Sequence, residues 1–296
     1  MGKMPASLDC ILCFMRQSLE AARFATEDES RHTDVIKQTL DLIRNKGFSV
    51  IPPILAQEIH RIVRKETSNP DPYAVQKREA NNLMLTVQDS LREQIRQSNE
   101  PLSFAVKVAI AGNCIDYAVR GDWNRDLLLQ TVESTIQQPI NGGTECFVEA
   151  IKKAKQILYL LDNSGEIVCD QLLIEEIKRF RPDVALVAVA HGSAVLNDAT
   201  LEDVRQTGLD KVVSVIDNGN DAPGTVLEQC SVEFMETFAN SDTIIAKGLA
   251  NYETLIEYDA GRLPQTVCYL FKAKCPFIAK CAGVAVGDLV VRVKLS

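Results

Sequence analysis

One stretch, residues 156–170, decides the fold: it reads QILYLLDNSGEIVCD. The five apolar residues 157–161 stand between polar neighbours, which is typical of a strand buried on both faces in a parallel sheet. Four polar or small residues, 162–165, follow, and the apolar spacing beyond them predicts a helix over about 165–180. In open α/β sheets, ligands bind outside the carboxyl ends of the strands, beside helix N-termini that attract anions. The stretch therefore predicts a strand, a polar turn where a ligand could bind, and a helix.

The turn itself has two interpretations. Asp162 and Asn163 offer hard oxygen donors that suit a divalent cation, and the helix start after them could hold a phosphate group. An Asx turn, with Asn163 or Ser164 capping the helix, accounts for the same residues without any ligand. The ends of the other predicted strands decide between these interpretations.

Composition limits the classes of protein. The chain has 296 residues, 46% of them hydrophobic and 24% charged, as in a globular protein with a large core. A net charge of −8 argues against a nucleic-acid partner, because no excess of basic residues is available for phosphates. No apolar run is long enough to cross a bilayer, and Asp9 and Arg16 interrupt the apolar residues of the N-terminus. We therefore expect a cytoplasmic protein with no membrane segment.

The first half of the chain has the periodicity of helices. The predicted helices cover about 8–22, 34–46, a segment starting at Pro52-Pro53, 73–98, 102–119 and 123–136. The segment 102–119 is unusually apolar, so its polar residues Asn113 and Asp116 need partners or a cavity. This half predicts a helical domain over residues 1–150.

The second half alternates between strands and helices. Strands are predicted at 156–161, 184–190, 211–216, 242–246 and 265–271, with helices at about 165–180, 200–207, 225–239 and 251–259. Such alternation indicates βαβ units and a mainly parallel sheet. The final run, 288–295, suits an edge strand, and an antiparallel one. An α/β domain is therefore predicted over residues 151–296.

Polar residues follow each of these strands. They include His191, LNDAT at 196–200, DNG at 217–219, KGLANYE at 247–253, and the pair Lys272 and Lys274. Caps, turns or surface lysines account for each group alone. Together, on one rim, they favour a cation bound by oxygens and a phosphate held by backbone N–H groups and lysine.

Other metal and phosphate motifs are absent from the sequence or weak. It has no P-loop, no G-x-G-x-x-G after the first strand and only three histidines, so a histidine-rich centre is poorly supported. Most of the nine cysteines are interpreted as buried small residues. Cys10 and Cys13 form a C-x-x-C pair, but the spacing of Cys275 and Cys281 does not complete a zinc site.

Several of these motifs together resemble one known family. They are Asp162-Asn163-x-Gly165-Glu166, the segments at 196–200 and 217–219, and Lys247-Gly248-x-x-Asn251-Tyr252-Glu253. The combination resembles the damage-control metal-dependent phosphatases, catalogued as the domain of unknown function 89 or ARMT-like family, over nearly the whole chain. Cys10-x-x-Cys13 and Gly112-Asn113-x-Ile115-Asp116 are similar to its compact prokaryotic branch.

This resemblance implies a helical N-terminal domain followed by a three-layer α/β/α, Rossmann-like domain. It also implies hydrolysis of phosphate monoesters of small metabolites, such as sugar phosphates, with Mn²⁺, Co²⁺, Ni²⁺ or Mg²⁺. The implied metal ligands are Asp162, Asn163 and Asp198. The implied phosphate and substrate contacts are Ser164, Gly165, Glu166, Lys247, Asn251 and Lys272.

Three structural hypotheses follow. Asp162, Asn163 and Asp198 share one cation, with Asp217 as the replacement if Asp198 faces away. Lys247 clamps the phosphate at the rim. The helical domain closes over the rim and selects the substrate through Asn113 and Asp116. The sequence has no D-x-D pair, which favours attack by an activated water molecule, although attack by Asp162 also remains open.

Two alternatives stay open at this stage. One is a Rossmann-like transferase that binds a nucleotide or another cofactor at the same rim, and the other is a non-catalytic module with a structural metal at Cys10 and Cys13. The expected partner is a small phosphorylated metabolite, with no nucleic acid and no membrane. The substrate, the preferred metal and the oligomeric state are left undecided by the sequence.

Overall fold

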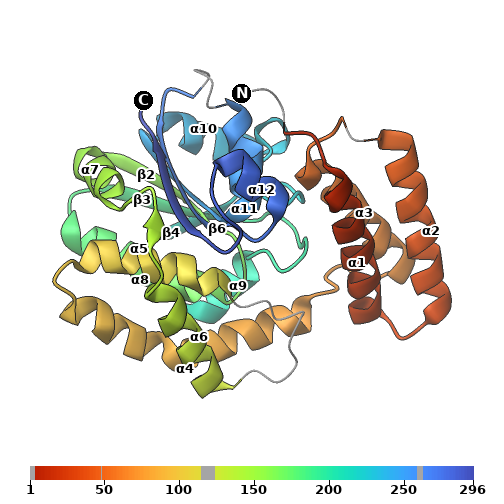
Figure 1. Cartoon of the computed structure of the whole chain (residues 1–296), viewed down its shortest axis with the longest axis horizontal. Helices are drawn as coiled ribbons and strands as arrows, with labels where there is room; N and C mark the ends of the chain where they lie inside the picture. Colours follow the sequence, from red (N-terminus) through yellow and green to blue (C-terminus); the bar gives the residue numbers. More distant parts are fainter. Residues whose placement is uncertain (1–3, 48, 115–123, 259–262) are drawn as a thin grey trace.

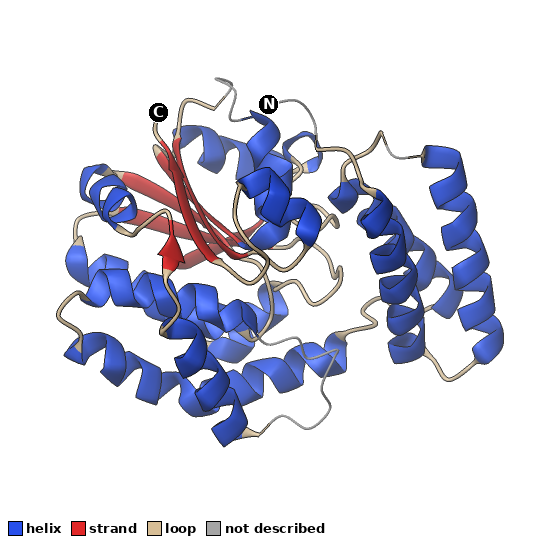
Figure 2. Cartoon of the chain, in the orientation of Figure 1, coloured by secondary structure: helices blue, strands red, loops and turns tan. Residues whose placement is uncertain are grey.

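The structure is a computed structural model that describes residues 4–47, 49–114, 124–258 and 263–296. Within these residues a seven-stranded sheet lies at the centre, helices cover both of its faces, and three helices stand beside it (Figures 1 and 2). The α/β class, the mainly parallel sheet and the helical N-terminal region are therefore confirmed.

The three N-terminal helices are α1 (Leu8–Ala25), α2 (Glu29–Lys46) and α3 (Pro52–Thr67). They bury small apolar clusters that are distinct from the two cores of the sheet, although Leu196 of the loop after β3 packs against one of them. As predicted, Pro52 begins α3, because a proline suits the first turn of a helix. Helix α2 begins earlier than predicted, since the Asp28 side chain accepts a hydrogen bond from the Ser30 N–H and caps it.

Two sets of helices form the outer layers. One face of the sheet shares its core with α4 (Ala74–Gln97), α5 (Pro101–Ala111), α6 (Arg125–Ile136), α7 (Glu145–Lys153), α8 (Glu166–Phe180) and α9 (Leu201–Thr207). The other face packs against α10 (Val232–Asn240), α11 (Gly248–Leu255) and α12 (Pro276–Ala282). Helices α4 and α5 contact α8 of the α/β layers, while the predicted division near residue 150 stays a prediction.

The described strands are β1 (Ile140–Asn141), β2 (Gln156–Leu160), β3 (Ala185–Ala190), β4 (Ser214–Asp217), β5 (Thr243–Lys247), β6 (Thr266–Lys272) and β7 (Leu289–Lys294). Their order is β1-β7-β6-β5-β2-β3-β4, so the first predicted strand, β2, lies inside the sheet between β5 and β3. Ile157 and Tyr159 point into one core, and Leu158 and Leu160 into the other. The prediction of a strand buried on both faces is correct.

The last strand differs from its prediction in one respect. β7 runs antiparallel to β6, as expected, but it is not the edge. The two-residue strand β1 pairs with it on the outside, through Ile140 and Asn141. A pairing this short leaves no periodicity in the sequence.

Several predicted elements begin or end elsewhere. The helix expected over 102–119 ends at Ala111 and continues as a 3-10 turn, because hydrogen bonds draw the Asn113 side chain to two carboxylates of the sheet domain. Helix α10 begins at Val232, not near 225, since Ser231 caps it. Residues 115–119, including Asp116, lie outside the described residues.

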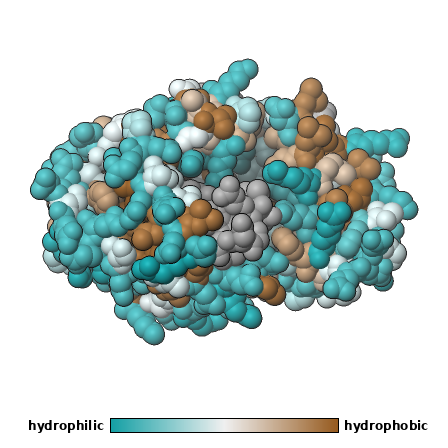
Figure 3. All heavy atoms as spheres, turned by 60° about the horizontal axis from the view of Figure 1, so that its bottom comes forward, coloured by the Kyte–Doolittle hydropathy of each residue, from teal (hydrophilic) through white to brown (hydrophobic). Residues whose placement is uncertain are grey.

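The surface agrees with the composition. Hydrophilic side chains cover most of the face shown in Figure 3, with smaller apolar patches between them. None of the helices in the described part of the chain has both the length and the apolarity to cross a membrane.

One ionic contact fastens the N-terminal helices to the sheet domain. Asp221, in the loop between β4 and α10, accepts hydrogen bonds from Arg61 and Arg64 at 2.6–2.8 Å. Gln57 donates to the same carboxylate at 2.7 Å and also to Gln229. The three donors belong to one face of α3, because they are spaced four and three residues apart. We call this set the α3 latch.

We predict that the α3 latch weakens in acid. Burial alone would raise the pKa of Asp221, but the hydrogen bonds from Arg61, Gln57 and Arg64 outweigh it and hold the pKa at about 2. A carboxyl group with a lowered pKa stabilises the fold above its unfolded pKa of about 4, and that contribution is lost as the pH falls through 2.

The test compares the free energy of unfolding of the wild type, Asp221→Asn and the exposed control Asp210→Asn, measured in urea at pH 7 and pH 3. Asp221→Asn should cost about 1.5–3 kcal/mol at pH 7, as for hydrogen bonds to a charged group, and less at pH 3. An equal loss at both pH values would contradict the assignment.

Candidate functional site

A cavity of about 680 Å³ lies between the N-terminal helices and the carboxyl ends of the strands. One wall comes from α1 and α3. The other comes from the loops after β2, β3, β4 and β6, from the 3-10 turn that follows α5, and from α11 and α12, with residues of α4 at the side. The polar residues of this second wall are Asn113, Asp162, Asn163, Ser164, Asn197, Asp198, Glu253 and Lys274. The rim predicted from the strand ends is therefore the floor of a real cavity.

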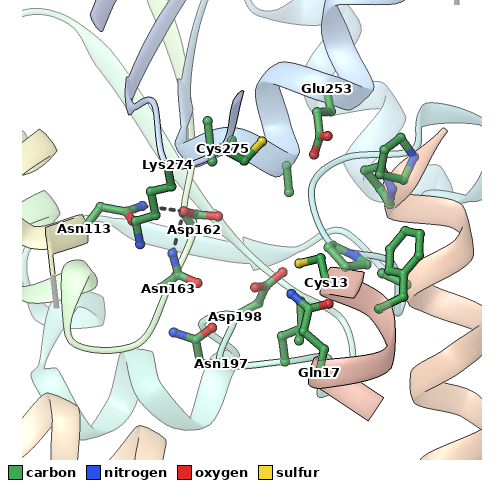
Figure 4. A pocket seen from close by; sticks show the side chains of 18 of the residues that line it. Cys13, Gln17, Asn113, Asp162, Asn163, Asn197, Asp198, Glu253, Lys274 and Cys275 are labelled. Carbon is green, nitrogen blue, oxygen red and sulfur yellow. Dashed lines mark hydrogen bonds between the residues drawn. The ribbon is translucent and has the colours of Figure 1, made fainter. Parts of the chain in front are cut away.

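Backbone pairing brings the two predicted metal-binding segments together. The Ala199 N–H donates to the Asp162 carbonyl, and the Ser164 N–H donates to the Asn197 carbonyl, both at 2.8 Å. Asn163 and Asp198 thus form an isolated antiparallel bridge across the ends of two neighbouring strands. The side chains of Asp162, Asn163 and Asp198 lie around one part of the cavity as a result (Figure 4).

Two carboxamides hold the Asp162 carboxylate from its inner side. Asn113 and Asn163 donate to its Oδ2 at 2.8 and 2.5 Å, and both also donate to Glu166 Oε2. Burial, and then the charges of Glu166 and Asp198, hold the pKa of Asp162 well above its usual range. The cluster therefore has more negative charge than its own donors satisfy.

Gly248 gives Asp162 the space that it occupies. A Cβ atom on Gly248 would lie 1.8 Å from Asp162 Oδ2 and 2.1 Å from its Cγ. The backbone at Gly248 also has φ of +77°, which side chains other than glycine's rarely tolerate. The glycine that begins α11 is thus part of the site, although it contributes no side chain.

Asp198 has a different environment. It is 3% exposed, and its Oδ2 lies 3.2 Å from His191 Nε2. Burial, followed by the positive charge of Lys77, lowers the pKa of His191 to about 4, so the imidazole is neutral near pH 7. The contact with Oδ2 lacks hydrogen-bond geometry, so within the described residues this buried oxygen has no hydrogen-bond donor. A bound cation is one way to satisfy it.

These residues fit a divalent cation. Asp162 and Asp198 supply carboxylate oxygens, and among the described residues no donor reaches the side-chain oxygen of Asn163. No three His, Cys, Asp or Glu side chains cluster as a metal centre in the described ranges, so a cation here would depend on a carboxamide as well. Asp217, the predicted replacement, accepts from the Gly219 N–H within its own turn.

Lys247 lies below the floor of the cavity and is not one of its lining residues. Its side chain is fully buried, and the ammonium donates to Glu166 Oε1 at 2.7 Å, to the Ala109 carbonyl at 3.0 Å and to Asp170. Tyr159 donates to the same oxygen of Asp170 at 2.8 Å.

Two neighbouring carboxyl groups explain why the ammonium group of Lys247 can be buried. Burial alone would lower the pKa of Lys247, but Asp170 and Glu166 outweigh it and raise that pKa above its usual range. Lys247 therefore fixes Glu166, whose other oxygen binds the two asparagines of the site. This geometry supports a positioning role more than the predicted phosphate clamp.

The other predicted contacts divide into two groups. Ser164 and Gly165 line the cavity, yet Ser164 donates to Asp203 and the Gly165 N–H donates to Asn81 at 2.6 Å. Neither of these two donors is free to bind a phosphate in this arrangement. Glu166, Asn251 and Lys272 do not line the cavity, since the first two are buried in hydrogen bonds and Lys272 ends β6.

Sequence reasoning missed a cationic side chain that lies beside the predicted metal ligands in the cavity. Lys274, two residues beyond the end of β6, lies beside Asp162, and its charge lowers the pKa of that carboxyl (Figure 4). The K-x-K spacing places both lysines at the end of the strand, but it does not show which of the two faces the cavity. The wall from α1 was missed as well, because Cys13 and Gln17 look like ordinary helix residues in the sequence.

Comparison with known proteins identifies relatives over the whole chain. The family model for the damage-control phosphatase ARMT1-like domain matches residues 6–290. An uncharacterized protein of Methanocaldococcus jannaschii is 38% identical, covering 96% of this chain and 93% of its own. Damage-control phosphatases of Pyrococcus horikoshii and Archaeoglobus fulgidus are each 34% identical, with 97% of their own length covered.

A solved structure agrees with the fold. The crystal structure of a protein of the domain of unknown function 89 family from Pyrococcus horikoshii superimposes with a TM-score of 0.88 at 32% sequence identity. The match covers 98% of this chain and 99% of that one.

We predict that Gly248→Ala lowers the affinity for Mn²⁺ at least tenfold, because the added methyl group displaces the Asp162 carboxylate. The matched control is Gly283→Ala, which has a similar φ of +70° but open space around the Cβ position. Calorimetric titration with Mn²⁺ measures both variants. An equal loss in the control would mean that backbone strain, and not the contact with Asp162, is the cause.

Lys247→Met should lower the free energy of unfolding by about 3–5 kcal/mol, because it leaves two buried carboxyl groups without their cation. Lys280→Met, on the exposed side of α12, should have little effect. Chemical denaturation of the wild type and of the two variants measures these free energies of unfolding. Wild-type stability in Lys247→Met, combined with weakened binding of phosphate esters, would restore the phosphate clamp.

Proposed function

The chain belongs to the damage-control phosphatase ARMT1-like family, and on this premise we propose that it is a metal-dependent phosphatase that hydrolyses phosphate monoesters of small metabolites. The substrate would be a phosphorylated small molecule, and the place of action the cytoplasm. Relatives that are named phosphatases favour this proposal over the transferase and the non-catalytic module.

One observation carries the proposal: two buried carboxylates, Asp162 and Asp198, share a cavity wall with a carboxamide oxygen and with Lys274. Burial raises the pKa of both carboxyl groups, and a bound cation would favour their ionised form. Mn²⁺, Co²⁺, Ni²⁺ and Mg²⁺ accept such oxygen ligands. When bound, the ion supplies Lewis-acid chemistry to a phosphate ester.

The protein's own residues would orient that chemistry. Asn113 and Asn163 each donate one hydrogen bond to Asp162 and another to Glu166, and so hold the Asp162 carboxylate in place. Lys274 would neutralise part of the charge on the phosphoryl oxygens, a role for which its place beside Asp162 is suited. The wall from α1 would limit the access of water to the ester once it is bound.

The test is release of inorganic phosphate from para-nitrophenyl phosphate, with and without Mn²⁺. We expect turnover that requires the metal and that falls at least a hundredfold in Asp198→Asn, because the negative charge of a ligand is lost. Lys274→Met should raise KM about tenfold, since it removes one charge contact.

Lys280→Met serves as the control for Lys274→Met, being an exposed lysine outside the cavity. Turnover that is equal with Mn²⁺ and with a chelator would refute the metal dependence. Absence of any phosphate release would refute the proposed activity.

A further inference from the structure

One ionisable side chain of the cavity takes no part in the cation site. Glu253 lies on α11, and with Leu249 and Ala250 it forms the helix face that lines the cavity. Figure 4 shows its carboxyl group pointing into the open space, across from Asp162 and above Cys13 and Gln17 of α1. Glu253 therefore faces whatever part of the ligand extends beyond the cation site.

Glu253 differs from Asp162 in its hydrogen bonding. Asp162 accepts hydrogen bonds from two asparagines, and the buried Asp203 beneath the floor accepts from Asn81 and Thr200. Glu253 makes no hydrogen bond or ion pair with any residue for which the structure gives a position. Its polar atoms are thus available to a ligand, and burying them without one costs free energy.

The surroundings favour the uncharged carboxyl group. Burial raises the pKa of Glu253 to about 8. The negative charge of an ionised Glu253 would raise the pKa of the thiols of Cys275 and Cys281. An uncharged carboxyl group does not repel a phosphate dianion in the same cavity. It also offers one O–H donor and one carbonyl acceptor, which together match a hydroxyl group.

The size of the cavity leaves room for such a contact. Its volume of about 680 Å³ lies within the range of sites that enclose a whole small molecule, and so exceeds what a phosphate group needs. With the phosphate at Asp162 and Lys274, the alcohol part of an ester would extend towards α11 and α1.

On the basis of the proposed function, we propose that Glu253 is a specificity-determining residue that hydrogen-bonds a hydroxyl group on the alcohol part of the phosphate ester. The substrates selected in this way are esters of polyhydroxylated alcohols, and simple alkyl phosphates are disfavoured. A site built to pair with a hydroxyl group discriminates strongly against the analogue that lacks it, because the buried group is then left unpaired.

The experiment compares two esters with the same number of carbon atoms, glucose 6-phosphate and n-hexyl phosphate, as substrates in the presence of Mn²⁺. The quantity measured is the ratio of their kcat/KM values. Glu253→Leu should lower this ratio about tenfold or more, through the lost hydrogen bond. Glu253→Gln should keep most of the wild-type ratio, because an amide both donates and accepts.

The control is Glu236→Gln, an exposed glutamate on α10, and the melting temperature of each variant is measured alongside. A ratio within twofold of the wild type in Glu253→Leu would overturn the inference and leave the phosphatase intact. So would an equal loss in Glu253→Gln and Glu253→Leu, because an amide that both donates and accepts would then fail to replace the hydrogen bond to the hydroxyl group. If the wild type released phosphate neither from these two esters nor from para-nitrophenyl phosphate, the proposed function would be overturned, and the inference with it.

Discussion

The structure depends on holding two like charges side by side in a buried place. Asp162 and Asp198 come from different loops, and the negative charges of their side chains repel each other. Hydrogen bonds between the backbones of the loops after β2 and β3 oppose this repulsion and hold both residues in the same wall. The energy of backbone pairing is thus used to create a region of strong negative potential, which is what a divalent cation requires.

The remaining charges around this site are arranged in pairs that keep it in place. Lys247 neutralises Glu166 and Asp170 below the floor, and Lys77 pairs with Asp203 and Asp71 at the side. These four carboxyl groups are therefore committed within the protein. Lys274, in contrast, carries its charge at the wall of the cavity, where a ligand can reach it.

The sequence was sufficient for the parts of the fold that periodicity controls. The strand at 157–161 and the donors just after it were predicted because a short apolar run that ends in Asp-Asn is typical of a buried strand and the turn that follows it. The roles of Lys247 and Lys272 could not be predicted in the same way. A lysine at the end of a strand can point into the cavity or into the core. Which of the two occurs depends on the pleat of the strand and on the helix that packs beneath it, and the local sequence shows neither.

Two other features were outside the reach of pattern reasoning. Asn113 ends a helix because of partners 49 and 53 residues away, and no local propensity reports such a contact. The wall supplied by α1 depends on where a separate group of helices is fastened. Contacts of this kind between distant segments leave no local pattern from which they could be predicted.

The apolar clusters of the N-terminal helices are distinct from the cores of the sheet, so the two walls of the cavity rest on different clusters. The floor that we propose to bind the cation is built into the sheet, while the opposite wall rests on α1 and is fastened through α3. Substitutions on α1 can therefore accumulate without disturbing Asp162, Asn163 or Asp198. A fold divided in this way can change its preferred ester during evolution while its hydrolytic chemistry is inherited unaltered.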